Sequence, residues 1–581
     1  MAGPESLTSG RRVGREQAST RALAPLTLCV GAGFVSAFAP GLVWRLETGD
    51  WVCLKDWDTS YYLRFVAQAY CHRALHISDV VVPGGVAGYP WLPFVPAVYA
   101  ARVLDAGPFA VELIWIFLSA IGLSASLYFV FRHFLERPWL AAGCTIVCLA
   151  DFGLADRPCI NQLELLASAL WLHPTGLVAI PWGFQLHWRV PDPGLGLPLM
   201  LFQIVALARA RERPTRLNVW LSGSAFGLLF YVFFYCWTMA MMGLGIAFLL
   251  DRGAHKACGL TLCVGSAIGL PQLIYTIHLA HLASPEAISR LGLFTPAPRL
   301  YQESAGTPFL LAMAAVALWI RKSKRFDLVY PWSLAVGGIL LSRSRVVSGI
   351  FFHEYHYTWL STPIWLALVL IVAVSIACAR FRWRPVAAPV CWTAVMLYFA
   401  GGIYLAVICV TRTWSGVQQV RNYTQYKLQR LATGVEPLVA GETIAGDDIF
   451  CELAAVAEYQ WVLGGQAVPI SMAVDNEQWE SREALNAYLV GKDRGEFEKE
   501  VRIAGEFWLW ENPTREREVI AAFMRKYDEV VRAPGRFIAR FGVRYVALAA
   551  DRAPVGYLRE GWTMLQRGPY WQLWERTRSA P

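Results

Sequence analysis

The chain has 581 residues, of which 56% are hydrophobic and only 16% are charged, and its formal net charge at pH 7 is +9. Soluble domains carry about 25% charged residues. This composition, with a mean hydropathy of +0.39, therefore excludes an ordinary soluble protein and indicates a polytopic membrane protein. The positive charge does not indicate a nucleic-acid partner, because basic residues concentrate in short clusters between apolar segments.

The first expected elements are a polar leader and a membrane anchor. Residues 1–23 are rich in arginine, and we expect them to form a disordered cytoplasmic leader. The apolar segment from Leu23 to Val43 is long enough to cross a hydrocarbon core of about 30 Å. Pro40 directly follows a small-residue sequence that resembles a signal-peptide cleavage site. Because Pro disfavours cleavage there, we expect an uncleaved anchor with its N-terminus inside.

Apolar segments recur along the chain up to residue 411. The expected further spans are 109–131, 138–154, 195–208, a close pair within 217–250, 257–282, 308–320, 329–342, 358–379 and 386–411. Residues 163–186 are interrupted by Pro and Gly, which predicts broken or re-entrant helices. Basic clusters such as 321–325 fall at every expected inner turn. The pattern predicts about eleven spans, with the N-terminus inside and the C-terminus outside.

The composition changes to that of a soluble domain from about residue 412. Charged residues become frequent, residues 481–489 and 515–526 predict helices, and residues 543–548 and 570–574 predict strands. The expected fold class is therefore mainly α. A polytopic transmembrane bundle over residues 24–411 would be followed by a small extracytoplasmic α/β domain over residues 412–581.

The candidate catalytic segment lies in the first outer loop, residues 44–108. Three carboxylates, Asp50, Asp56 and Asp58, follow the first span closely. In Asp56-Trp57-Asp58, two carboxylates could hold a divalent cation such as Mg²⁺ or Mn²⁺, or one could take a proton from an acceptor hydroxyl as general base. The structural alternative is that Asp58 caps a helix while Asp56 is a solvated charge. The position after the first span favours function, but the pattern does not identify the base.

The residues that follow this motif predict a helix lying along the membrane surface. Asp58-Thr59-Ser60 provides side-chain oxygens that can cap its first turn. From Tyr61 to Tyr70 the apolar residues cover one broad helical face, whereas Arg64 and Gln68 lie on the other. A helix with these two faces is typical of a membrane interface.

A second polar cluster is expected at the outer face, just before the span 358–379. Arg343 and Arg345 suit a phosphate or diphosphate headgroup, because guanidinium groups bind phosphate oxygens bidentately. His353, Glu354 and His356 follow, and the two histidines could be metal ligands or phosphate donors. Their spacing is not that of the zinc-protease motif. The structural alternative is a polar cluster that caps the next helix.

Two further outer segments carry candidate substrate-binding residues. Asp156 and Arg157 are expected in the second outer turn, where they could face the first loop, or could simply form a turn at the membrane boundary. Arg189 follows the interrupted segment 163–186 and could bind phosphate, with a structural role equally open.

With these segments in place, the chain resembles the C-type glycosyltransferase superfamily. The resemblance rests on Asp56-Trp57-Asp58 near the membrane end of the first outer loop, on the arrangement of spans, and on two C-terminal patterns. These patterns are Phe541-Gly542-Val543-Arg544-Tyr545-Val546 and Tyr570-Trp571-Gln572-Leu573-Trp574. The resemblance implies a polytopic enzyme with an extracytoplasmic tail domain that uses a polyprenyl-phosphate-linked sugar. The oligosaccharyltransferase run W-W-D-Y-G is absent, and no subfamily is identified.

The expected function is therefore that of an integral-membrane glycosyltransferase in the cell inner (plasma) membrane. Its expected partners are a polyprenyl-phosphate-linked sugar, the lipid bilayer and a saccharide, lipid or protein acceptor, with no nucleic acid. The alternative is a multi-pass transporter or lipid flippase, because interrupted helices and intramembrane polar residues also fit that class. A third hypothesis is an assembly or receptor protein whose tail domain binds a partner.

Overall fold

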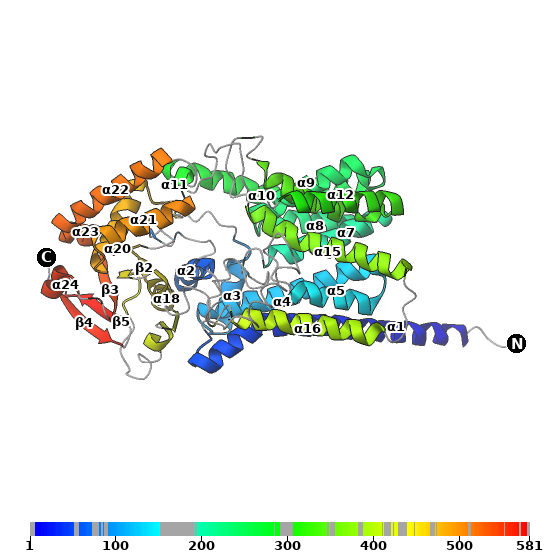
Figure 1. Ribbon diagram of the computed structural model, residues 1–581, viewed down its shortest axis with the longest axis horizontal. Coiled ribbons are helices and arrows are strands. Elements are labelled where there is room, and N and C mark those ends of the chain that lie inside the picture. The colour runs from blue at the N-terminus through cyan, green and yellow to red at the C-terminus, as the bar shows by residue number, and fades with distance from the viewer. Residues whose placement is uncertain are drawn as a thin grey trace.

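The protein consists of a helical bundle with a small sheet-containing domain at one end, as the computed structural model shows (Figure 1). The structure describes residues 6–51, 57–72, 79, 81–82, 85, 91–150, 191, 194–283, 285–290, 306–344, 348, 355–380, 387–408, 411, 420–421, 423–427, 438–446, 448–464, 471, 473–508, 513–550, 552, 554–568 and 571–577.

The first helix, α1, is longer than the expected span. It extends from Ser6 to Thr48 and contains the segment Leu23–Thr48, which is long and apolar enough to cross a membrane. Helix α1 thus begins within residues 1–23, for which a disordered cytoplasmic leader stays a prediction. The residues from Ser6 to Ala22 include no Pro and several strong helix formers, so the helix continues back without interruption.

Each expected span outside residues 151–190 corresponds to a helix. The remaining helices of this part of the chain are α2 (Trp57–His72), α3 (Val95–Val103), α4 (Phe109–Leu135), α5 (Pro138–Ala150), α7 (Gly196–Glu212), α8 (Arg216–Leu229), α9 (Phe234–Leu250), α10 (His255–Leu282), α11 (Pro285–Arg290), α12 (Gly306–Ser323), α13 (Val329–Leu341), α15 (Tyr355–Arg380) and α16 (Ala387–Ile408), with short 3-10 turns at Arg252–Ala254 and Phe326–Leu328. The interrupted segment 163–186 lies outside the described residues.

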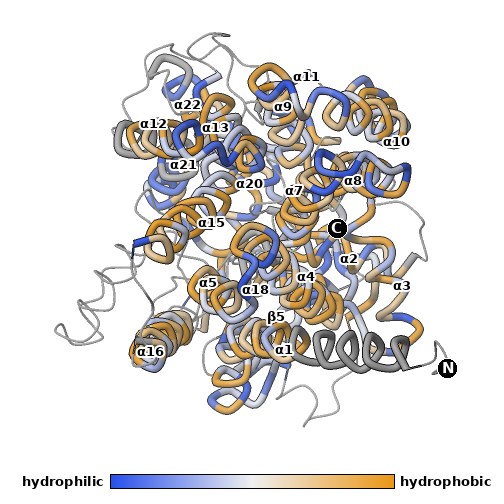
Figure 2. Tube along the Cα trace, turned by 90° about the vertical axis from the view of Figure 1, so that its right-hand side faces the viewer, coloured by the Kyte–Doolittle hydropathy of each residue, from blue (hydrophilic) through white to orange (hydrophobic). Residues whose placement is uncertain are grey.

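Not every bundle helix is long enough to cross a membrane. Among the described residues, five segments meet that length and composition: Leu23–Thr48, Phe109–Leu135, Arg252–Leu282, His356–Arg380 and Ala388–Ile408. Pro138–Ala150, Phe234–Leu250 and Phe326–Leu341 are apolar but shorter. Helices α5, α15 and α16 are mainly hydrophobic in the view along the bundle (Figure 2). The protein is thus an integral membrane protein, whereas the number of spans and their orientation stay predictions.

Several helix ends that carry basic clusters meet at the end of the bundle remote from the sheet, which we call the basic end. There His133, in the last turn of α4, contacts Glu212 of α7 at 3.5 Å. Arg325 donates to the carbonyl of Phe134 at 3.1 Å. Clustering of basic residues on one side agrees with the positive-inside pattern used to assign the turns.

The C-terminal domain contains one five-stranded sheet. Its strands are β1 (Thr443–Gly446), β2 (Trp461–Val462), β3 (Val543–Ala549), β4 (Trp562–Arg567) and β5 (Trp571–Arg576), in the order β2-β1-β3-β5-β4. β1 pairs in parallel with β2 and β3, and β5 pairs antiparallel with β3 and β4. The helices are α18 (Asp448–Glu458), α20 (Asn476–Leu489), α21 (Arg494–Trp508), α22 (Pro513–Arg532), α23 (Pro534–Phe541) and α24 (Gly556–Gly561).

Two of the five strands agree with the sequence pattern. The expected runs 543–548 and 570–574 correspond to β3 and β5, and the expected helices 481–489 and 515–526 lie within α20 and α22. β4 was also missed, and β1 and β2 were missed because they are only 4 and 2 residues long. A segment this short has too few residues to show the alternation that marks a strand.

Helices α9 and α13 pack closely because glycine lies between them. A Cβ at Gly243 would lie 2.9 Å from the Cα of Leu334 and 3.2 Å from its backbone nitrogen. Small residues allow this approach of two backbones, which is the usual way in which membrane helices pack.

We expect Gly243→Ala to lower the free energy of unfolding by about 1–3 kcal/mol, because the new methyl group meets the backbone of Leu334. The matched control is Gly245→Ala in the same helix, where a Cβ meets nothing within 4 Å. That change should leave stability equal or raise it by about 0.5–1 kcal/mol. Thermal unfolding in detergent measures both variants, and equal Tm values would contradict the close contact.

Glu477 provides a pH-dependent contribution to the stability of the C-terminal domain. Its carboxylate contacts Arg540 at 2.7 Å and Lys526 at 3.2 Å. The hydrogen bond from Arg540 is the main cause that lowers the pKa of Glu477 to about 2. Because the folded-state pKa is below the unfolded value, this contribution is present above about pH 4.5 and is lost as the pH falls toward 2.

We therefore expect Glu477→Gln to lower the Tm at pH 7, with a difference from wild type that shrinks as the pH is reduced below about 4.5. The control is Glu560→Gln, which changes an exposed carboxylate of α24. A Tm difference for Glu477→Gln that is independent of pH would show that the charge of Glu477 does not contribute in this way.

Candidate functional site

The acidic motif of the first outer loop lies at the start of helix α2. The helix begins at Trp57, so Asp58 is in its first turn. The structure therefore agrees with the expected helix start. Asp56 and the side chain of Asp58 lie outside the described part of the chain.

Helix α2 is buried, so the expectation of an exposed polar face is wrong, whereas its position along a membrane surface stays a prediction. Every described side chain from Tyr62 to Ala69 is buried, and this includes Arg64 and Gln68, which were expected on an exposed polar face. The reason is that α2 is covered on two sides, by α18 of the C-terminal domain and by α3 and α4 of the bundle. Figure 1 shows α2 at this junction, next to α18 and α3.

Aromatic rings fill the side of α2 that faces the bundle. Phe94 lies at the centre, with its ring centroid 6.0 Å from those of Tyr62 and Phe65. On its other side it packs edge-on against Trp115 of α4 at 5.4 Å. Such ring pairs stabilise beyond the area they bury, and they fix α2 against the first turns of α4.

A buried ion pair fills the side of α2 that faces the C-terminal domain. The Nη2 of Arg64 lies 2.9 Å from Oε1 of Glu452 in α18, and the two side chains are only 3% and 1% exposed. A single buried charge is very unfavourable, whereas a paired charge is tolerated. The partners are 388 residues apart in sequence, so this contact exists only when the domain is docked on the loop.

Asp50 provides a second link, on the other side of the motif. Its side chain lies within 2.9 Å and 3.2 Å of the Lys427 ammonium group through its two oxygens, and Oδ1 accepts the N–H of Trp51 at 2.7 Å. Nearby, Arg421 contacts Glu47 at 2.8 Å and lies over the ring of Trp44. The carboxylate of Asp50 is therefore engaged by a cation from the segment after the last bundle helix.

Asp79 ties the second half of the loop to the domain. It accepts hydrogen bonds from the hydroxyl of Ser471 at 2.8 Å and from the N–H groups of Val81 and Val82. Burial raises the pKa of Asp79, although these hydrogen bonds and the charge of Arg482 oppose that shift. The first loop is thus anchored to the C-terminal part of the chain before, after and within α2.

A second group of candidate residues gathers at the same end of the bundle. His356, in the first turn of α15, lies 4.4 Å from the ring of Tyr235, 5.7 Å from Phe233 and 4.9 Å from Trp359. Tyr231 and Phe233 lie in the connection between α8 and α9. Trp91 of the first loop packs edge-on against Tyr231, with the ring centroids 6.0 Å apart. An aromatic surface therefore links the first loop to the start of α15.

Of the other expected residues, Arg343 is described and half-buried, directly after α13. Asp156, Arg157, Arg189, Arg345, His353 and Glu354 lie outside the described residues. Within the described part of the chain, no group of three or more His, Cys, Asp or Glu side chains is arranged to hold a metal ion.

Reasoning from the sequence missed the residues that hold the loop, namely Arg421, Lys427, Glu452 and Ser471. Glu452 carried a signal, because it is a single acidic residue within the apolar stretch Ile449–Ala457. An acidic side chain in such a stretch is expected to be paired when it is buried. No local pattern indicated that Arg64 is the partner of Glu452, because the two residues are 388 positions apart in sequence.

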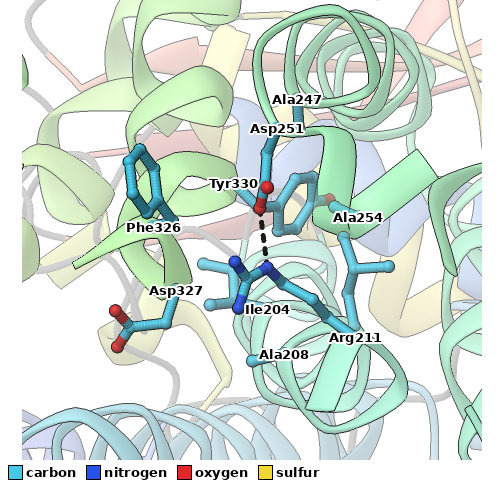
Figure 3. Close-up of a pocket in the computed structure, with 10 residues that line it drawn as sticks. Ile204, Ala208, Arg211, Ala247, Asp251, Ala254, Phe326, Asp327 and Tyr330 are labelled. Carbon is cyan, nitrogen blue, oxygen red and sulfur yellow. Dashed lines mark hydrogen bonds and ion pairs between the residues drawn. The ribbon is translucent and has the colours of Figure 1, made fainter. Parts of the chain in front are cut away.

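The pocket at the basic end is a structural feature rather than a substrate site (Figure 3). It contains the ion pair between Arg211 and Asp251, whose Nε and Oδ2 atoms are 2.6 Å apart, with Tyr330 and Asp327 beside it. The space inside it is about 10 Å³, which is room for one water molecule at most. This cluster therefore joins α7, α9 and α13 at the end remote from the motif.

We expect Lys427→Ala to lower the free energy of unfolding by about 1–3 kcal/mol, because it removes the cation that contacts the buried carboxylate of Asp50. The control is Arg502→Ala, which removes an exposed ion pair with Glu498 inside α21 and should change stability by less than about 1 kcal/mol. Thermal unfolding of both variants measures the difference. Equal Tm values would show that the link through Lys427 does not stabilise the loop.

Comparison with known proteins gives a match in structure only. No family model matches the chain, and no curated protein matches it. The structure of ArnT from Cupriavidus metallidurans bound to undecaprenyl phosphate matches with a TM-score of 0.51 and 14% identity, over 96% of this chain and 99% of that chain. Apo ArnT matches with a TM-score of 0.49 and 13% identity, over 97% and 100%.

The archaeal oligosaccharyltransferase AglB from Archaeoglobus fulgidus, in complex with an inhibitory peptide and a dolichol-phosphate, matches with a TM-score of 0.45 and 11% identity, over 91% of this chain and 69% of that chain. These structural neighbours are glycosyltransferases of the C-type fold. The match to undecaprenyl-phosphate-bound ArnT, over nearly the full length of both chains, shows that this protein shares that fold. The resemblance expected from the sequence is therefore confirmed for the fold, and the subfamily is not identified.

Proposed function

We propose that the protein is an integral-membrane glycosyltransferase that moves a sugar from a polyprenyl-phosphate-linked donor to a saccharide, lipid or protein acceptor. The observation that carries this proposal is the shared fold with ArnT, whose structure holds undecaprenyl phosphate. It is supported by the placement of the acidic motif, which begins a helix buried between bundle and domain. We further propose that the C-terminal domain is extracytoplasmic and that the membrane is the cell inner membrane.

The proposed donor site lies at the end of the bundle that faces the domain. Arg343, with Arg345 and Arg189, would bind the phosphate, because guanidinium groups match phosphate oxygens bidentately. The rings around His356 would provide a flat surface for the apolar faces of the sugar or the first isoprene units. Asp156, Arg157, His353 and Glu354 are proposed to complete the substrate site.

The proposed reaction is a single displacement at the anomeric carbon. Asp56 or Asp58 takes the proton from the acceptor hydroxyl, and the acceptor oxygen forms a bond to the anomeric carbon. The bond from that carbon to the phosphate oxygen breaks, and the lipid phosphate leaves with the electron pair. The guanidinium groups stabilise the negative charge that develops on the leaving phosphate. A divalent cation such as Mg²⁺ or Mn²⁺, held by the same carboxylates, remains the alternative role for the motif.

Asp50 has a different place in this proposal. Its carboxylate contacts the Lys427 ammonium group through both oxygens. Because both of its oxygens contact this cation, we assign Asp50 to holding the segment that contains Asp56 and Asp58. The catalytic role is thereby narrowed to the two carboxylates of the motif.

The placement of charge argues against a transporter or flippase. A transporter places ionisable residues near the middle of the membrane. In the described bundle helices, from Leu23 onward, the acidic residues lie in the first or last turn or directly after the helix end. They include Glu47, Glu112, Glu136, Glu212 and Asp251.

The test uses the full-length protein in nanodiscs with a panel of radiolabelled polyprenyl-phosphate sugars, with and without EDTA. We expect wild-type turnover, and at least a 100-fold loss of kcat in Asp56→Asn or Asp58→Asn, because general-base catalysis contributes about 10²–10⁴-fold. Inhibition by EDTA would assign the motif to metal binding, and resistance would assign it to proton transfer.

The control is Asp105→Asn, an exposed carboxylate later in the same loop, where Asn tolerates the left-handed backbone (φ 50°). It should keep wild-type kcat. If the protein binds the donor without turnover, and neither Asp56→Asn nor Asp58→Asn changes that binding, the glycosyltransferase proposal would be overturned. A transporter would then be favoured.

A further inference from the structure

The described contacts of the first loop bracket the acidic motif between two ion pairs. Before the motif, Asp50 contacts Lys427 at 2.9 Å, and after it Arg64 contacts Glu452 at 2.9 Å. The partner residues in these two pairs are Lys427 and Glu452. Both lie after α16, which ends at Ile408. The segment with Asp56 and Asp58 is thus held at both ends by the C-terminal part of the protein.

The second pair acts on the motif through a rigid element. Arg64 and Asp58 lie in the same helix, six residues or about 9 Å apart along its axis. The helix between them is fixed sideways, since Tyr62 and Phe65 pack against Phe94 on the bundle side. A displacement of Arg64 relative to α18 therefore moves the start of α2 as well.

An ion pair is not needed merely to hold these two helices together. The neighbours of Glu452 along α18 are apolar and buried, namely Cys451, Leu453, Ala454 and Ala455. In such surroundings an apolar pair of similar volume is often as stable as a buried ion pair. The ion pair in addition fixes how α2 is oriented relative to α18, because a charged hydrogen bond has a narrow range of distances and angles.

We propose that Arg64 and Glu452 are positioning residues of the active site, and that the C-terminal domain is through them a working part of that site. This inference rests on the proposed function. The pair sets the rotation and depth of α2, the helix at whose start the acidic motif lies. Misplacement of a catalytic group by about 1 Å can cost about 100-fold in rate.

The experiment separates positioning from folding by comparing single and double variants in nanodiscs. Arg64→Met and Glu452→Met each remove one of the two charges of the buried pair, and both should lower the Tm and kcat. The double variant, Arg64→Met with Glu452→Met, removes both charges and should recover the Tm. We expect its kcat to stay at least 10-fold below wild type, with a donor KM within about 2-fold, because the apolar pair does not fix the direction of α2.

The matched control is Asp251→Asn, which breaks the ion pair with Arg211 at the basic end, remote from the motif. It should lower the Tm without changing kcat at temperatures where the variant is folded. If the double variant does not fold, Arg64→Lys decides, because it keeps the charge but loses the planar guanidinium geometry. We expect Arg64→Lys to lower kcat at least 3-fold with a Tm near that of wild type.

A double variant, or in its place Arg64→Lys, with wild-type kcat would overturn the inference, because the pair would then only stabilise the fold. The proposed function would still stand in that case, since wild-type turnover and its loss in Asp58→Asn are measured in the same assay. Absence of turnover in the wild type with every donor would instead overturn the proposed function, and this inference with it.

Discussion

The arrangement of the domain-facing end of this protein depends on one buried ion pair, Arg64 with Glu452. Neither charge is tolerable alone in an interior with a low dielectric constant, so each needs the other for its own burial. Helix α2 can therefore be buried only when α18 covers it. The sheet domain, the first loop and the first turns of α4 form one packed unit for this reason.

The two ends of the bundle differ in the side chains that connect their helices. At the basic end, ion pairs such as Arg211 with Asp251 connect helix ends around a space no larger than a water molecule. At the other end, aromatic rings connect Trp91, Tyr231, Tyr235 and His356 beside the buried loop helix. Rings present flat apolar surfaces and a few polar atoms, a combination that suits sugars and lipids. At the basic end, by contrast, charged groups such as Arg211 and Asp251 bind each other.

The acidic residues of the first loop divide into two groups. Asp50 and Asp79 contact Lys427 and Ser471, so their oxygens are used to attach the loop to the C-terminal part of the chain. The motif at the start of α2 lies between these two attachments. This division explains how a loop can be acidic without every carboxylate taking part in chemistry: some fix the backbone on which the others are carried.

The sequence by itself determined the elements whose signals are local. Long apolar runs predict the bundle helices wherever the chain is described, and the runs at 543–548 and 570–574 predict β3 and β5, because hydrophobic content and alternation depend only on neighbouring residues. The tertiary structure alone decided that α2 is buried, that Arg64 pairs with Glu452, and that Asp50 pairs with Lys427. The partners are 388 and 377 residues apart, and a helix with Arg and Gln on one face looks the same in sequence whether that face meets water or a buried carboxylate.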